Sequence, residues 1–260
     1  AGVSAEILAA DEASGDRGRI FAGHLRATHY APGNVSRWRR FADFAAGDFA
    51  EGRRAAEVLE RAVRHCGRSG ELWLQLHAEH EGAGTPLPGL RGVLERGVAV
   101  LSSTDAEHEA ADTSAIQELL LQHADAVRRA GAPLPEGADR GELWRELRAV
   151  LERAVGLAEA PGADGSSCCQ ALMRWMRLEA YAIRSPEGTL SAGHRLMKFW
   201  GSYYNAWSSF IAAALHCSGA SAYTTVRDLY MEAMAQVVDY PEQIRTDYLQ
   251  FERELGTVKS

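Results

Sequence analysis

Apolar residues recur along this chain with the period of an α-helix rather than that of a β-strand. Between residues 55 and 63 they have the i, i+3, i+4, i+7, i+8 spacing of one buried helix face. Glu60 and Arg61 lie off this stripe, so we expect them to reach solvent or a neighbouring helix. No stretch alternates apolar and polar residues with β-branched enrichment. The pattern therefore predicts an all-α protein.

One six-residue phrase occurs three times in the chain. VLERAV occupies residues 58–63, VLERGV follows at 93–98, and VLERAV returns at 150–155. The first two copies start 35 residues apart, and Trp38 and Trp73 share that interval. A common period near 34 residues indicates a helix–turn–helix unit of tetratricopeptide size. Because a lone helical hairpin cannot bury its apolar face, the phrase is predicted to recur with the interface between hairpins.

The repeat predicts five pairs of helices after a partial first unit. The third pair is lengthened by an acidic stretch at residues 102–112 and by a Pro/Gly-rich loop at residues 131–141. Pro241 suits the first turn of a last helix. We expect residues 1–35 to hold the partial repeat and its connection, and residues 36–260 to form an α–α superhelix of five to six hairpins. The apolar positions of the partial unit are Ile20, Phe21 and Leu25.

Contacts between hairpins are expected to combine large apolar side chains with small residues. A small residue is needed where two helices cross closely, and Gly97 takes the place of alanine in the second copy of the phrase. The predicted packing positions are Trp38, Phe41, Leu59, Ala62, Trp73, Leu94, Leu151, Ala154 and Trp175.

Aromatic residues are concentrated towards the C-terminus. Residues 199–251 hold 11 of the 21 aromatic residues, six of them tyrosine. Tyrosine combines a large contact area with a polar tip, which is typical of protein interfaces. The last predicted helix has no second helix after it, so its apolar face is expected either to form a symmetric homodimer or to be capped by residues beyond Ser260. The candidate dimer contacts are Tyr204, Trp207, Tyr230, Ile244, Tyr248, Phe251 and Leu255.

Several longer segments carry a more specific pattern. They are RHCGRSGELW at residues 64–73, CCQALMRWMRLEAY at 168–181, NAWSSF at 205–210, and VVDYPEQIRTDYLQFERELGT at 237–257. A first helix with Trp-x-x-aromatic, followed by a second helix with a Leu/Tyr-Glu-Arg-Ala-type phrase, resembles the half-a-TPR (HAT) repeat of RNA-processing proteins. The four segments are similar to the second HAT subdomain of the SART family, nuclear factors that recycle the U4/U6 snRNP.

The resemblance implies a HAT/TPR-like solenoid that serves as a non-enzymatic scaffold for pre-mRNA splicing in the nucleus. It also implies homodimerisation and docking of snRNP proteins and ubiquitin-specific proteases. One alternative is a HAT scaffold of the cleavage/polyadenylation or crooked-neck type. Another is a TPR-like co-chaperone that clamps a C-terminal carboxylate, although the lysines and asparagines such a clamp uses are scarce. The chain has only Lys198, Lys259, Asn34 and Asn205.

Charge and composition narrow the classes of partner. A net charge of −7 repels phosphate, so direct RNA binding by this chain is not expected. There is no run of about eighteen apolar residues and no basic leader before an apolar segment, so neither a membrane span nor a secretory signal is expected. The cysteines lack zinc-ligand spacing and are interpreted as reduced packing thiols. They are Cys66, Cys168, Cys169 and Cys217.

Two residue pairs carry groups that could bind metal or react. His77 and His80 are spaced i, i+3, which matches neither of the common two-histidine zinc motifs, so we interpret them as part of a solvated helix face. Cys217 next to His216 lacks an orienting third group. No catalytic residue, metal site or cofactor is therefore predicted. The densest basic cluster, interpreted as a solvated face or a contact for an acidic partner, is Arg37, Arg39 and Arg40.

Overall fold

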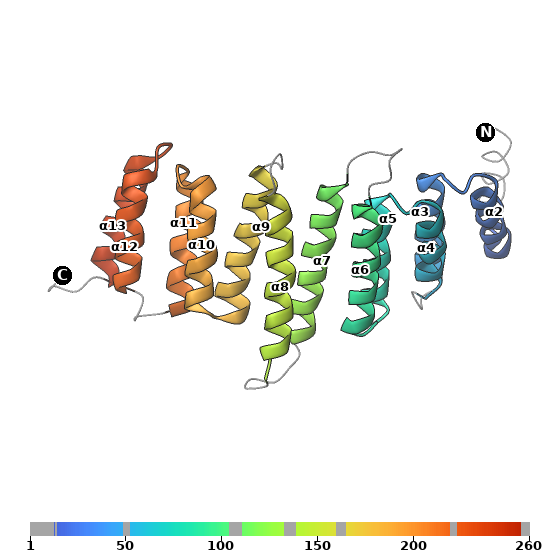
Figure 1. The fold of residues 1–260 in the computed structure, drawn as a ribbon, viewed down its shortest axis with the longest axis horizontal. Coiled ribbons are helices and arrows are strands. Elements are labelled where there is room, and N and C mark those ends of the chain that lie inside the picture. The colour runs from blue at the N-terminus through green and yellow to red at the C-terminus, as the bar shows by residue number, and fades with distance from the viewer. Residues whose placement is uncertain are drawn as a thin grey trace. The chain divides into compact units, whose positions relative to one another are not determined.

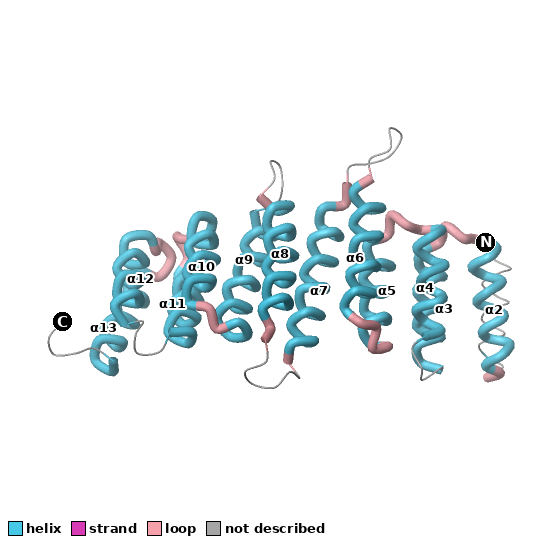
Figure 2. Tube along the Cα trace, turned by 60° about the horizontal axis from the view of Figure 1, so that its bottom comes forward, coloured by secondary structure: helices cyan, strands magenta, loops and turns pink. Residues whose placement is uncertain are grey.

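The protein is built from α-helices that pack against their neighbours along the chain (Figure 1). The computed structural model describes residues 13, 15–48, 53–103, 111–132, 139–159, 165–218 and 223–255. These residues form twelve α-helices and one short π-helix, and none of them lies in a β-strand (Figure 2). The predicted all-α class is confirmed. The chain divides into two compact units, Ala1–Ala154 and Val155–Ser260, with the division inside helix α8.

The first unit consists of paired helices. Each helix from α2 to α6 packs against the next one in the chain, and α5 also packs against α7. Short loops join α2 to α3 and α4 to α5 (Figure 2). The helices are α2 (Arg17–Tyr30), α3 (Val35–Asp48), α4 (Arg53–His65), α5 (Gly70–Gly82), α6 (Leu87–Ser102), α7 (Thr113–Gly131) and α8 (Gly141–Ala158).

The ends of several helices follow from local sequence. The side chains of Asp16 and Asp112 accept hydrogen bonds from backbone N–H groups in the first turns of α2 and α7, which satisfies donors that have no partner within the helix. Helix α7 ends at Gly131, as predicted. The lengthening segments of the third pair lie largely outside the described residues, at positions 104–110 and 133–138.

The apolar face of the repeated phrase is buried in each copy. A glycine replaces alanine in α6 because the space is already occupied: a Cβ at Gly97 would lie 2.8 Å from Leu119 Cδ2 and 3.2 Å from the Trp73 ring. The phrase therefore fixes where one helix crosses its neighbours. Its buried residues include Val58, Leu59, Ala62 and Val63 in α4, Val93, Leu94 and Gly97 in α6, and Val150, Leu151 and Ala154 in α8.

The polar residues of the phrase connect one copy to the next. Arg96 donates to both carboxylate oxygens of Glu60, at 2.9 and 2.6 Å. Arg153 donates in the same way to Glu95, at 2.6 and 3.2 Å. We call these two pairs the Glu–Arg rungs. The acid of one copy thus bonds to the arginine of the following copy, and Glu60 reaches a neighbouring helix.

Three helices share a hydrogen bond near their N-terminus. In each, a tryptophan indole N–H donates to the backbone carbonyl six residues earlier, at 2.7 Å. We call this contact the indole bond; it ties the preceding connection to the first turn of the helix. The donor and acceptor residues are Trp38 and Pro32, Trp73 and Gly67, and Trp207 and Gly201.

The second unit continues the pairing with one irregularity. Helix α9 passes directly into the π-helix, in which the buried Glu179 accepts a hydrogen bond from the Trp175 indole at 3.1 Å. Trp175 therefore does not make the indole bond of Trp38, Trp73 and Trp207. Helix α13 begins at Pro241, as predicted. The elements are α9 (Gly165–Leu178), η1 (Glu179–Ile183), α10 (Pro186–Trp200), α11 (Tyr204–Ser218), α12 (Tyr223–Gln236) and α13 (Pro241–Leu255).

Candidate docking site

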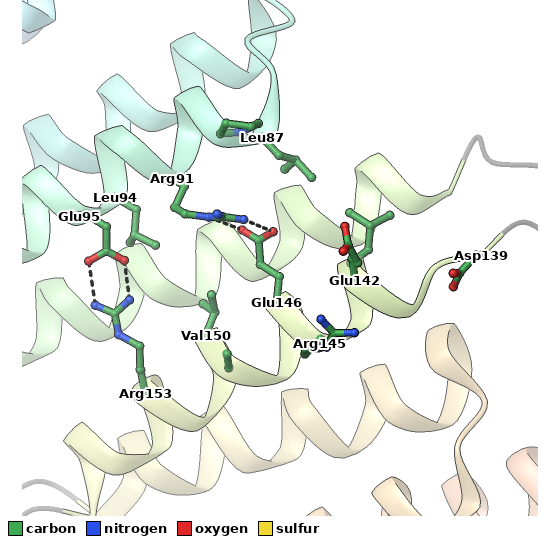
Figure 3. Close-up of a pocket in the computed structure, with 13 residues that line it drawn as sticks. Leu87, Arg91, Leu94, Glu95, Asp139, Glu142, Arg145, Glu146, Val150 and Arg153 are labelled. Carbon is green, nitrogen blue, oxygen red and sulfur yellow. Dashed lines mark hydrogen bonds and ion pairs between the residues drawn. The ribbon is translucent and has the colours of Figure 1, made fainter.

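A groove of about 760 Å³ lies between α6 and α8 in the first unit (Figure 3). This volume is in the range of pockets that bind small molecules or a few side chains of a peptide. The apolar part of its lining comes from both helices. The residues are Leu87, Pro88, Leu94, Leu143, Ala149 and Val150.

Two ion pairs span the groove from α6 to α8. One is the Glu95–Arg153 rung, and the other joins Arg91 to Glu146, with Nη2 2.6 Å from Oε2 (Figure 3). The hydrogen bonds from Arg153 lower the pKa of Glu95. Burial raises the pKa of Glu146, but the bonds from Arg91 and His123 outweigh this effect and lower it overall. Both carboxylates are therefore ionised at neutral pH.

Glu146 also has a partner in the interior of the unit. His123 of α7 is fully buried, and its Nε2 lies 3.4 Å from Glu146 Oε1. His123 Nδ1 lies 3.0 Å from Nε2 of His77 in α5. The polar rim of the groove is thus connected to a buried pair of histidines.

The prediction that His77 lies on a solvated face is wrong. His77 is 0% exposed because α7 packs against α5 and covers this face. His80 is half-buried; its Nδ1 lies 3.2 Å from Thr85 Oγ1 and its Nε2 lies 3.6 Å from Glu60 Oε1. The described residues contain no group of three or more His, Cys, Asp or Glu side chains placed to bind a metal ion.

A second cavity, of about 610 Å³, lies between α4 and the turn that precedes α6. Its lining includes Arg61, Arg64 and the rung residue Glu60. It lacks the large apolar side chains of the α6–α8 groove, so the groove is the stronger candidate for docking a protein segment.

The predicted packing residues occupy the interior with one exception. Trp38, Phe41, Leu59, Ala62, Trp73, Leu94, Leu151 and Ala154 are buried. Trp175 is half-buried, and the Arg195 guanidinium lies 5.4 Å from the centre of its ring.

Four of the seven candidate dimer residues belong to the core of the second unit. Trp207, Tyr230, Ile244 and Phe251 are buried, so in this conformation they cannot contact a partner. Burial raises the pKa of Tyr230 to about 12. The remaining three candidates are more accessible: Tyr204 and Tyr248 are half-buried, and Leu255 is exposed.

Other apolar residues near α12 and α13 are exposed. Val238 is 75% exposed, and Met231, Tyr240 and Leu249 are exposed as well. Concentration of aromatic residues in the sequence indicated this end of the chain but not these positions. Helix periodicity could have singled out Leu249, which lies between the buried positions of α13.

The arginine cluster in α3 is partly engaged within the unit. Arg37 donates to the Ala27 carbonyl at 3.0 Å, and Arg39 donates to Glu71 at 2.7 Å. Cys66, Cys168, Cys169 and Cys217 are free thiols, and the first three are buried. None of the described helices has the length and apolar composition that crossing a lipid bilayer requires.

Comparison with known proteins identifies no family for this chain. No protein-family model matches the chain, and no curated protein sequence matches it significantly.

Proposed function

We propose that the chain is a non-enzymatic scaffold that docks other proteins, built as a HAT-type solenoid of helical hairpins. The observation that carries this proposal is the recurrence of the same contacts, the indole bond and the Glu–Arg rung, in successive hairpins. Stacked repeats of this kind hold side chains on extended surfaces that suit protein binding. The α6–α8 groove is the proposed docking site for a partner segment.

The scaffold is proposed to act in the nucleus, in U4/U6 snRNP assembly and recycling during pre-mRNA splicing. This part is supported by the resemblance of residues 168–181 and 237–257 to the SART family. The DYPE sequence also has a structural role, because its Asp239 accepts a hydrogen bond from the Tyr204 backbone N–H at 2.8 Å. The proposed partners are snRNP proteins and ubiquitin-specific proteases.

The test is affinity purification from nuclear extract followed by quantitative mass spectrometry. Ala149 is an exposed residue of the groove lining, and Ala149→Arg would fill the groove without removing a buried side chain. Ala99→Arg places the same side chain at an exposed position of α6 outside the lining. We expect U4/U6 snRNP proteins to be enriched by the wild type and Ala99→Arg, and lost with Ala149→Arg. Enrichment of polyadenylation factors or of chaperones instead would favour the corresponding alternative.

We further propose that a second copy of the chain binds at α12 and α13. Exposed apolar side chains on α12, α13 and their connection favour protein contact. Val238, Leu249 and Leu255, rather than the buried aromatic residues, would form the contact. Sedimentation equilibrium should give a dimer for the wild type and a monomer for Leu249→Glu. Val100→Glu, at an exposed apolar position of α6, is the matched control and should remain dimeric. A wild-type monomer at micromolar concentration contradicts the proposal.

Direct RNA binding is not part of the proposed function. With a net charge of −7, any RNA affinity would depend on a local basic patch and would fall steeply with salt. Titration with single-stranded and duplex RNA at low salt should show no saturable binding.

A further inference from the structure

We propose that His77, His123 and Glu146 form a proton-sensitive latch that holds α7 against α5 and α8. The three side chains come from these three helices and form one hydrogen-bonded chain. The distances along it are 3.0 Å from His77 Nε2 to His123 Nδ1 and 3.4 Å from His123 Nε2 to Glu146 Oε1. Both imidazoles are 0% exposed. The inference does not depend on the proposed scaffold function.

The Glu146 carboxylate determines which ring nitrogen of each histidine carries the proton. Glu146 can only accept, so His123 must carry its proton on Nε2 to donate to it. His123 Nδ1 is then an acceptor, and His77 must donate to it from Nε2. This leaves His77 Nδ1 without a proton, buried, and without a hydrogen-bond partner among the described residues. The latch is therefore built from two neutral histidines with a fixed direction.

Additional protons disturb this arrangement in two stages. A first proton on His123 Nδ1 is stabilised by Glu146, but it forces His77 to move its own proton to the unpartnered Nδ1. A second proton would place two buried cations in contact, because the facing nitrogens are 3.0 Å apart. Protonation of both histidines therefore requires α7 to separate from α5.

The surrounding charges do not compensate the second proton. Glu81 favours a charged His77, but Arg129 and His80 oppose it, and Arg129 is itself bonded to Glu81 at 2.6 Å. Glu60 of α4 faces His80 rather than His77.

The carboxylates of Glu146 and Glu95 favour a charged His123, and the cation of Arg91 opposes it. Each of these acids is already bonded to an arginine. The latch is thus surrounded by satisfied ion pairs.

The pKa directions agree with the geometry. Burial, followed by the charge of His123, lowers the pKa of His77 to about 4, and burial lowers the pKa of His123. Below about pH 6.5, His77 and His123 therefore bind protons in the unfolded chain but stay neutral in the folded chain. Stability from the latch is complete above about pH 6.5 and is lost as the pH falls towards 4.

Release of the latch would also change the structure of the docking groove. Glu146 bonds both to His123 inside the unit and to Arg91 on the groove rim. Movement of α7 would remove the inner partner of Glu146 and loosen the α8 wall of the groove. Acidification is thus expected to open the first unit at α5, α7 and α8, while α10 to α12 of the second unit serve as an internal reference.

Hydrogen exchange on the full chain tests the latch, with protection factors corrected for the intrinsic pH dependence of exchange. Between pH 6.5 and 5, protection in α5 and α7 should fall about tenfold per pH unit for each proton refused by the folded state. This fall should be absent in His77→Leu/His123→Leu. In His29→Leu, an exposed control, it should persist. Loss of protection at the same pH in α10 to α12, or an unchanged slope in the double variant, would overturn the proposal.

Imidazole NMR of the wild type provides a measurement that does not require the double variant to fold. Long-range ¹H–¹⁵N spectra should show protons on Nε2 of both His77 and His123 at pH 7.5. His77 should stay neutral at pH 5.5, where an ordinary histidine with a pKa near 6.5 is mostly charged. Titration of His77 near pH 6.5 with the fold intact, or a proton on Nδ1 of either histidine at pH 7.5, would refute the latch.

Discussion

The two units use different polar contacts to join helices that are packed by the same kind of apolar stripe. In the first unit, the Glu–Arg rungs join equivalent helices, with the acid on the earlier helix. In the second unit, Arg195 bonds at 3.2 Å to Glu159, an acid that precedes it in the chain, whereas His194 lies 3.8 Å from Glu232, an acid on a later helix. The polar contact can thus change residue type and polarity while the buried stripe persists. This is expected, because exposed ion pairs contribute little compared with buried side chains.

The units also differ in the polar groups they bury. The first unit contains the proposed latch, in which the buried His77 and His123 are both neutral. The second contains the buried carboxyl of Glu179, which accepts the Trp175 indole N–H. Burying a polar group requires a partner in either case, and we propose that the histidine pair loses its arrangement when protons are added in mildly acidic solution. Acid sensitivity should therefore begin in the first unit.

The largest expected effect comes from removing a tryptophan that makes the indole bond. Trp38→Ala in the first unit and Trp207→Ala in the second each remove a buried ring and its hydrogen bond. We expect each to lower the free energy of unfolding by about 3–5 kcal/mol. Hydrogen exchange should show lost protection mainly in the unit that carries the substitution. Trp200→Ala, at a half-buried ring of α10, is the control and should cost less; an equal cost would contradict the importance of the indole bond.

An intermediate effect is expected at the glycine in the second phrase. Gly97→Ala installs the residue found at Ala62 and Ala154, yet its Cβ would crowd Leu119 and Trp73. We expect a loss of about 1–3 kcal/mol in urea unfolding. Gly92→Ala in the same helix meets no atom within 4 Å and should instead stabilise by about 0.5–1 kcal/mol. Stabilisation by Gly97→Ala would show that the three copies of the phrase are interchangeable.

The smallest effect concerns the rungs themselves. Glu95→Gln should reduce stability by about 0.2–1 kcal/mol in low salt and by less in 1 M NaCl. The double exchange Glu95→Arg/Arg153→Glu gives this rung the polarity of the Arg91–Glu146 pair between the same two helices and should restore most of the loss. Because the Arg153 bonds lower the pKa of Glu95, the contribution should be present above about pH 4.3 and disappear as the pH falls. A double exchange less stable than Glu95→Gln would show that rung polarity is fixed in the first unit.

Helix period and turn residues were sufficient to predict the helices and many of their ends. They identified the stripe of α4, the end of α7 at Gly131 and the start of α13 at Pro241, because these depend on local spacing and backbone preference. The π-helix after α9 was not predicted, since its sequence continues an ordinary helical pattern. Local sequence thus determines the elements better than their irregularities.

The candidate site was harder to predict because it depends on distant contacts. His77 and His123 are 46 residues apart, so local sequence does not reveal their contact, although Leu119, Leu120 and Val127 place His123 on an apolar helix face. The groove residue Glu146 was missed for the same reason. At the other end, aromatic content indicated an exposed interface, whereas Trp207 and Phe251 form the core of the second unit. Tertiary packing decides between these outcomes, and composition alone does not.

The indole bond has a consequence for where the chain can be lengthened. It spans the short connections Ala31–Asn34, Cys66–Ser69 and Gly201–Tyr203, which separate α2 from α3, α4 from α5 and α10 from α11. An added residue there would pull the carbonyl away from its indole. The connections before α7 and α9 are longer, and among the described residues neither of these two helices makes the bond. We therefore expect a tag or an inserted domain to be tolerated better before α7 or α9, where no indole bond restrains the length of the connection.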